Sequence, residues 1–190
     1  MPAGRGPTCR GAPLPGPSGP ARRLRCQEPG PDVQPFDRDE LAALFDDVRP
    51  QDLHLPDLRP VDWGVLDFLG WIHPAGHLGY VALRVDGEAV GIAMQRSRFT
   101  GRRRRTHMCA WCHMLRPGSD VAMFSRYVDG SNGRVSVGVT LCGALDCSLR
   151  LRNLTGDPRL VMPENYGLGW KVRRLEHAVE TYVRRVRPVF

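Results

Sequence analysis

The chain has 190 residues, and 42% of them are hydrophobic, which is close to the average for globular proteins. This length accommodates one ordinary domain with a modest core. No stretch has the pattern of a signal peptide, and none approaches the ~20 apolar residues of a membrane helix. We therefore expect a cytoplasmic protein without a membrane partner. In that compartment, clustered cysteines are metal ligands or redox groups more often than disulfides.

The formal net charge of +7 is unevenly distributed along the chain. Residues 1–35 have five Arg and two acidic residues (+3), residues 36–95 have four Arg and eleven acidic residues (−7), and residues 96–190 have eighteen basic and seven acidic residues (+11). This asymmetry predicts two surfaces that suit different partners. The densest positive cluster contains Arg103, Arg104 and Arg105. It is either a solvated loop or a contact with ribosomal RNA or with an acidic face of a partner.

Residues 1–35 are rich in Pro, Gly and Arg and have no hydrophobic periodicity, so we expect a disordered tail in which Cys9 and Cys26 are free thiols. A start of translation further downstream is the alternative. Residues 36–60 predict a short helix over Asp37–Val48 that ends at Pro50, followed by a proline-punctuated connector.

Residues 61–190 are expected to form the main domain. The run from Trp63 to Ile72 predicts core packing, and residues 78–95 predict a β-hairpin that turns at Asp86-Gly87. A second hairpin is predicted over residues 120–142, with Val135, Val137 and Val139 on its half-buried strand. The last element is an amphipathic helix with an apolar stripe and an exposed Glu180–Arg184 pair. The stripe comprises Val172, Leu175, Val179, Tyr182, Val183 and Val186. The fold class is therefore α+β, with the helix packed on the sheet.

Four cysteines form two closely spaced pairs: Cys109 with Cys112, and Cys142 with Cys147. The hairpin between the pairs can bring them together, and four thiolates in this pattern are typical of a structural, tetrahedral Zn²⁺ site with one ion per chain. A redox pair would require a βαβ context, which is missing. His107 and His113 flank the first pair and are the alternative ligands.

Four cysteine ligands leave no open position on the metal, which argues against catalysis there. The sequence also lacks a phosphate-binding loop, a nucleophile elbow and a paired carboxylate motif. We therefore expect a protein that is not an enzyme and has no small-molecule substrate.

The run Met108-Cys-Ala-Trp-Cys112, the strand DVAMFSRYV and the segment TLCGALDCSLRLR resemble the C-terminal treble-clef zinc finger of the elongation-factor-G-binding family, which includes the fusidic-acid resistance proteins. The motif DFLGW (Asp67–Trp71) and the hairpin after it match the segment that precedes the finger in that family. The resemblance covers about residues 61–187.

This resemblance implies a translation factor that binds elongation factor G and promotes its release from the ribosome. Carried over by position, Cys109, Cys112, Cys142 and Cys147 are the metal ligands. The exposed face of the finger is then the partner-binding surface, to which the following residues contribute: Met108, Phe124, Arg126, Tyr127 and Thr140. For Phe124 and Tyr127, whose side chains point to opposite faces of one strand, the alternative is a core position and a plain surface position.

A zinc finger that binds RNA or DNA without elongation factor G is the second hypothesis. The excess positive charge of residues 96–190 favours it. Against it, the sequence shows no clear aromatic stacking platform and no recognition helix in the finger.

Overall fold

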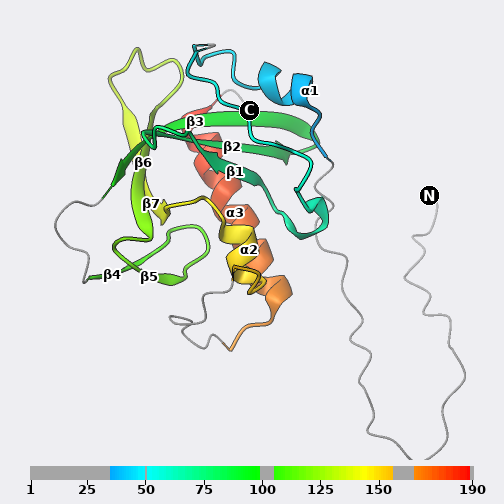
Figure 1. Ribbon diagram of the computed structural model, residues 1–190. Coiled ribbons are helices and arrows are strands. Elements are labelled where there is room, and N and C mark those ends of the chain that lie inside the picture. Colours follow the sequence, from blue (N-terminus) through cyan, green and yellow to red (C-terminus); the bar gives the residue numbers. More distant parts are fainter. Residues whose placement is uncertain (1–34, 50, 99–104, 156–164, 189–190) are drawn as a thin grey trace, which may run out of the picture.

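The computed structural model describes residues 35–49, 51–98, 105–155 and 165–188, so nearly all of the predicted disordered tail lies outside the described residues. A five-stranded antiparallel sheet with the order β1-β2-β3-β6-β7 forms its centre (Figure 1). A two-stranded sheet, β4-β5, lies in the chain between β3 and β6. The strands are β1 (Leu69–Ile72), β2 (Leu78–Val85), β3 (Glu88–Arg98), β4 (Thr106–Met108), β5 (Leu115–Pro117), β6 (Val121–Tyr127) and β7 (Ser136–Cys142).

Both predicted hairpins are present. Asp86 and Gly87 join β2 to β3 with φ angles of 51° and 86°, the left-handed conformation that this tight turn requires. In the second hairpin, Val137 is buried and Val139 is half-buried. Val135 is different, because it precedes β7 and is exposed.

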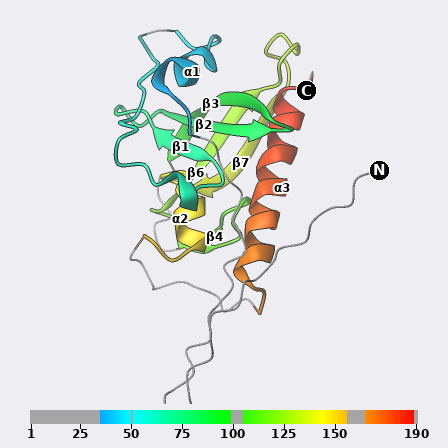
Figure 2. The same cartoon turned by 90° about the vertical axis from the view of Figure 1, so that its right-hand side faces the viewer.

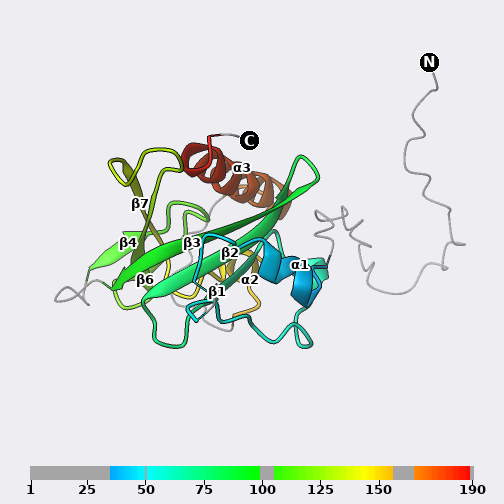
Figure 3. The same cartoon turned by 90° about the horizontal axis from the view of Figure 1, so that it is seen from above.

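The helix α3 (Leu168–Val186) covers one face of the sheet, as Figures 2 and 3 show. All six residues of the predicted apolar stripe are buried, which confirms the periodicity argument. A hydrogen bond to Asp86 and, to a smaller extent, the charge of the predicted partner Glu180 raise the pKa of Arg184. Arg184 donates to Asp86 in the β2–β3 turn at 2.6 Å and so ties the helix to the sheet.

The helix α1 (Arg38–Ala43) covers the opposite face of the sheet (Figure 3). Asp37 caps it by accepting from the Glu40 backbone N–H at 2.7 Å. The helix is shorter than predicted because the chain turns where Leu44 lies against the backbone of β3. A Cβ atom on Gly91 would be only 2.6 Å from the Leu44 carbonyl oxygen.

The two faces of the sheet carry separate hydrophobic clusters. The larger cluster joins β2, β3, β6 and β7 to α3 and contains all four paired cysteines. The smaller one joins α1 and the connector, including the 3₁₀ helix η1 (Trp63–Val65), to β1 and β2, and it is built around stacked Trp71 and Tyr80 with Phe45 at their edges. None of the described helices is long and apolar enough to cross a membrane.

Candidate metal centre

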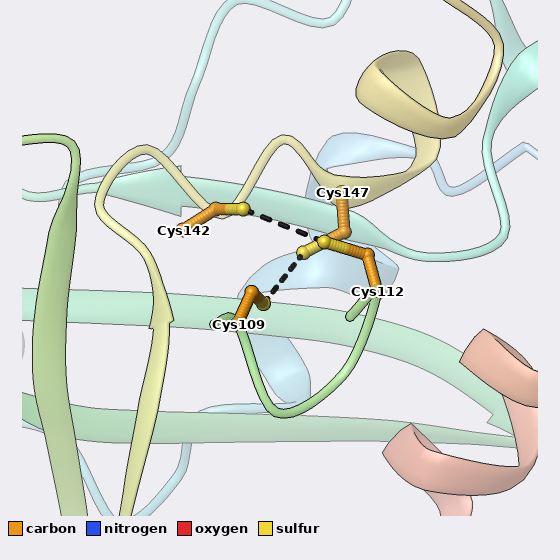
Figure 4. Close-up of side chains that lie close together, drawn as sticks. All are labelled: Cys109, Cys112, Cys142 and Cys147. Carbon is orange, nitrogen blue, oxygen red and sulfur yellow. Dashed lines mark hydrogen bonds between the residues drawn. The ribbon is translucent and has the colours of Figure 1, made fainter. Parts of the chain in front are cut away.

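The fold brings the two cysteine pairs to one point. Cys109 and Cys112 lie in the loop between β4 and β5, Cys142 ends β7, and Cys147 begins the short helix α2 (Cys147–Leu151). All four side chains are fully buried, and their sulfur atoms lie within 4.8 Å of one another. Figure 4 shows the four sulfur atoms pointing toward a common centre. Among the described residues, this is the group of side chains suited to hold a metal ion, and neither His107 nor His113 belongs to it.

The spacing of the sulfur atoms fits zinc. Cys109 Sγ lies 3.7 Å from Cys147 Sγ, and Cys112 Sγ lies 3.6 Å from Cys142 Sγ. A tetrahedron with Zn–S bonds of about 2.3 Å has edges of about 3.8 Å. The cage therefore has nearly the size of a ZnS₄ site, and its four soft ligands complete the coordination shell.

Backbone hydrogen bonds hold the first cysteine turn, residues 109–114, in shape. Cys109 N–H donates to the Met114 carbonyl at 3.0 Å, and His113 N–H donates to the Cys109 carbonyl at 2.9 Å. Ala110 N–H reaches across to the Thr140 carbonyl of β7 at 2.9 Å, so the turn is fixed to the strand that carries the second pair.

The second cysteine turn, residues 142–147, is fixed to its surroundings at Gly143. Gly143 N–H donates to the Asp120 carbonyl at 2.7 Å, and Arg96 Nε donates to the Gly143 carbonyl at 3.1 Å. Leu145 has a φ angle of 57°, which reverses the chain before Cys147. Cys147 begins α2, and the backbone N–H groups at the start of a helix favour a thiolate there.

The thiols of the cage do not ionise independently. Hydrogen bonds from Cys112, Cys142 and Cys147 lower the pKa of Cys109, whereas the hydrogen bond to Cys109 raises the pKa of Cys142 and of Cys147. The Cys109 thiolate is thus stabilised by its neighbours and opposes the ionisation of Cys142 and Cys147. A divalent cation removes this repulsion, so zinc binding must displace protons from the cage.

The DFLGW segment packs against both cysteine turns of the metal centre, a role that the sequence alone did not reveal. Phe68 packs edge-on against Trp111 of the first cysteine turn, with ring centroids 5.4 Å apart. Gly70 lies under the second turn, because a Cβ atom there would be 2.6 Å from the Leu145 carbonyl oxygen. Asp67 accepts two hydrogen bonds from Arg152, the residue that follows α2, at 2.7 and 2.8 Å.

Two of the expected partner-binding residues lie inside the protein. Phe124 is fully buried in the larger core cluster. The side chain of Arg126 is 9% exposed and forms ion pairs with Asp47 and Asp129 at 2.7 and 2.9 Å. Phe124 therefore fills the core, as in the alternative interpretation, and Arg126 holds the loops of Asp47 and Asp129 against the sheet.

The other expected residues are at least partly exposed. Met108 and Tyr127 are 54% and 55% exposed, and Thr140 is half-buried. Thr140 is paired with Met123, a residue that sequence reasoning missed although strand alternation places it on the same face as Tyr127. Met123 is 39% exposed.

The arginine cluster is only partly described. Arg103 and Arg104 lie outside the described residues, and Arg105 is exposed. Of the other arginines near the cysteines, Arg116 pairs with Asp120 and Arg150 with Asp146. Although burial opposes it, the pKa of Arg150 is raised, because the Asp146 hydrogen bond and the charges of Asp146 and Cys142 favour the cation. Arg150 thus offsets part of the negative charge of the cage.

Comparison with known proteins agrees with this geometry. A search of curated proteins finds no match. Among solved structures, that of the fusidic acid resistance protein FusC has a similar fold, with a TM-score of 0.53 and 15% sequence identity. The match covers 82% of this chain and 60% of FusC, so this chain spans less than two thirds of that protein. Residues 46–186 match the family described as FBP C-terminal treble-clef zinc-finger. With its four cysteines clustered as a treble-clef zinc site, the chain belongs to this family.

Proposed function

We propose that this chain is a non-enzymatic cytoplasmic protein that holds one structural Zn²⁺, binds elongation factor G and promotes its release from the ribosome. The likeness to FusC and the family of the zinc finger support this function. The observation that carries the proposal is the open face of the sheet at β6 and β7, which presents the exposed side chains of Met123 and Tyr127 on the side opposite the cluster that contains the cysteines.

That face is a continuous part of the sheet. Tyr80 faces α1 and pairs with Ala93; two residues further on, Gln95 pairs with Ser125, so Ser125 lies on the same side of the sheet. By the same alternation, Met123 and Tyr127 also face this side. However, the hydrophobic cluster under α1 contains no residue of β6 or β7, so the helix leaves their part of the face open.

The open face has the composition of a protein-binding surface. Met123 and Tyr127 are separated by the small residues Ser125 and Gly138, which pair with each other. Aromatic and Met side chains are enriched in the cores of interfaces, whereas charged side chains are depleted there. We define the finger face as Met123, Tyr127 and Thr140, and we assign elongation factor G to it. Met108, exposed on β4 of the separate two-stranded sheet, remains a predicted contact.

Titration calorimetry of the zinc-loaded protein with purified elongation factor G tests the binding step. We expect one-to-one binding that weakens at least about tenfold in Met123→Ala and in Tyr127→Ala, as central interface residues do. Leu154→Ala is the matched control, because Leu154 is 57% exposed but lies outside the finger face. If the folded, zinc-loaded protein gives no heat, the assignment to elongation factor G is wrong.

A ribosome sedimentation experiment tests the release step. Elongation factor G held on ribosomes by fusidic acid is mixed with this protein, and the factor is quantified in the pellet and in the supernatant. We expect the parent protein to move the factor to the supernatant and Tyr127→Ala to fail. Binding without release would restrict the function to sequestration of the factor.

A further inference from the structure

Three planar side chains form a stack at the start of α3. The rings of Tyr166 and Trp170 have centroids 4.3 Å apart and planes inclined by only 19°. The guanidinium of Arg174 lies 4.9 Å from the centroid of the Trp170 ring. Trp170 and Arg174 are four positions apart on α3 and so lie on one stripe of the helix, whereas Tyr166 precedes the helix and stacks on the Trp170 ring. We call this group the aromatic ladder.

The ladder is exposed, unlike most aromatic side chains of this protein. Tyr166 is 56% exposed and Trp170 is 42% exposed, whereas Trp71 and Trp111 are 9% and 2% exposed. Leu168, between the two rings in sequence, is 48% exposed. Adjacent exposed apolar groups mark binding surfaces more often than scattered single ones.

The ladder is anchored to the first cysteine turn through Arg174. Arg174 donates from its Nη2 atom to the Cys112 carbonyl of the first cysteine turn at 3.1 Å. The guanidinium is thus fixed at one end of the stack and the Trp170 ring is held between it and Tyr166. A preorganised stack loses little side-chain entropy when a further planar group is added to it.

The charge around the ladder identifies the chemistry of that group. Residues 165–175 include Lys171, Arg173 and Arg174 and contain no Asp or Glu, and Glu164 and Glu176 flank this run. Arg173 is exposed beside the ladder. Aromatic rings next to cationic side chains bind single-stranded nucleic acids, in which the bases stack on the rings and the phosphates meet the cations. An acidic protein would satisfy the charges but not the ring faces, and a duplex hides the faces of its bases.

We propose that the aromatic ladder is a stacking platform for a single-stranded nucleic acid, in which the first base stacks on the Tyr166 ring. This site is separate from the Tyr127 end of the finger face. Asp129 N–H donates to the Val186 carbonyl at 2.8 Å, so the strand end that carries Tyr127 lies at the C-terminal end of α3. The ladder lies at the other end of this helix, which is about 27 Å long (Figure 2). Both surfaces can therefore be occupied at once.

Fluorescence anisotropy with a labelled oligoadenylate of about 12 nucleotides tests the proposal. The decisive variant is Tyr166→Ala, and Tyr166→Phe is its matched control, because Phe keeps the ring face. We expect affinity to fall about 5- to 150-fold in Tyr166→Ala and to change less than about twofold in Tyr166→Phe. An abasic oligomer with the same number of phosphates should bind the parent more weakly and should not distinguish the two variants.

A second pair of variants separates local charge from net charge. Arg173→Gln and Arg185→Gln remove the same charge from exposed positions at the two ends of α3. The positions are about 18 Å apart along the helix, which exceeds the Debye length of about 8 Å at physiological salt. We expect Arg173→Gln to weaken oligoadenylate binding and to lower its salt dependence, with a smaller effect of Arg185→Gln.

The proposal is overturned if Tyr166→Ala binds oligoadenylate as tightly as the parent protein, or if the abasic oligomer binds as well as oligoadenylate. It is also overturned if Tyr166→Ala loses elongation factor G and keeps nucleic acid, since the ladder would then be a protein-binding surface. Tyr127→Ala should retain full oligoadenylate binding, which keeps this test independent of the finger face.

Discussion

The carboxylate of Asp67 joins two segments that are 85 residues apart in the chain. It is 1% exposed and holds Arg152, which is 12% exposed, through two hydrogen bonds. Asp67→Ala leaves the Arg152 guanidinium largely buried without its counter-ion. We expect the free energy of unfolding to fall by about 3 kcal/mol, as measured by urea denaturation of the zinc-loaded protein.

The matched control is Asp57→Ala. Asp57 also accepts from an arginine, Arg59, through both oxygens, but the two side chains are 52% and 90% exposed. A solvent-exposed ion pair contributes little to stability, so this variant should have the same free energy of unfolding as the parent protein. Equal losses in the two variants would show that burial does not decide the strength of the Asp67 pair.

For Glu176 on α3 we predict the opposite effect, a substitution that stabilises the folded protein. Partial burial raises its pKa above the ordinary value of 4.5, with help from the negative charges of Asp67 and Glu180. The folded state therefore holds this proton more tightly than the unfolded state, and stability is lost as pH rises from 4.5 through the raised pKa. Glu176→Gln removes this cost at pH 7.

We expect Glu176→Gln to raise the melting temperature by about 1–2 °C at pH 7 and to lose this advantage as the pH falls toward 4.5. The exposed Glu88→Gln serves as the control for the same chemical change. A gain that persists unchanged at acid pH would exclude the ionised carboxylate as its cause.

Among the secondary structure elements, those set by local pattern were predictable. The stripe of α3 repeats with helical periodicity, and Asp86-Gly87 is suited to the left-handed turn between β2 and β3. The ligand set followed from the spacing of the cysteines. What could not be predicted depends on contacts between distant segments. Arg126 is interior because loops supply Asp47 and Asp129, and Tyr166 and Trp170 stack only because α3 begins where it does.

The close packing of β1 against the second cysteine turn predicts the effect of a substitution at Gly70. A methyl group on Gly70 would lie 2.6 Å from the Leu145 carbonyl oxygen, and this backbone atom cannot move unless the turn moves. We expect Gly70→Ala to destabilise the protein by about 1–3 kcal/mol and to weaken zinc binding, measured by chelator competition. In the control Gly64→Ala, the nearest atom is Asp62 Oδ1 at an ordinary 3.5 Å, and both quantities should stay unchanged.

At the scale of the whole molecule, the cysteines of the metal centre belong to the larger hydrophobic core. The larger hydrophobic cluster contains the four cysteines together with residues of β2, β3, β6, β7 and α3, whereas the cluster under α1 contains none of the cysteines. Structural zinc contributes about 10–16 kcal/mol of apparent binding energy in small fingers, which matches or exceeds the typical stability of a domain, about 5–15 kcal/mol. The cage therefore decides whether the finger folds.

We expect zinc removal by a chelator, or the variant Cys142→Ser, to unfold much of residues 100–155 and to loosen α3. Hydrogen exchange followed by mass spectrometry should show lost protection first in β4–β7 and α2, and last in the segments that pack under α1. Cys26→Ser, a thiol outside the predicted ligand set, is the control and should retain the parent pattern. A chelated protein that keeps its melting temperature and its protection in β6 and β7 would show that the core folds without the metal.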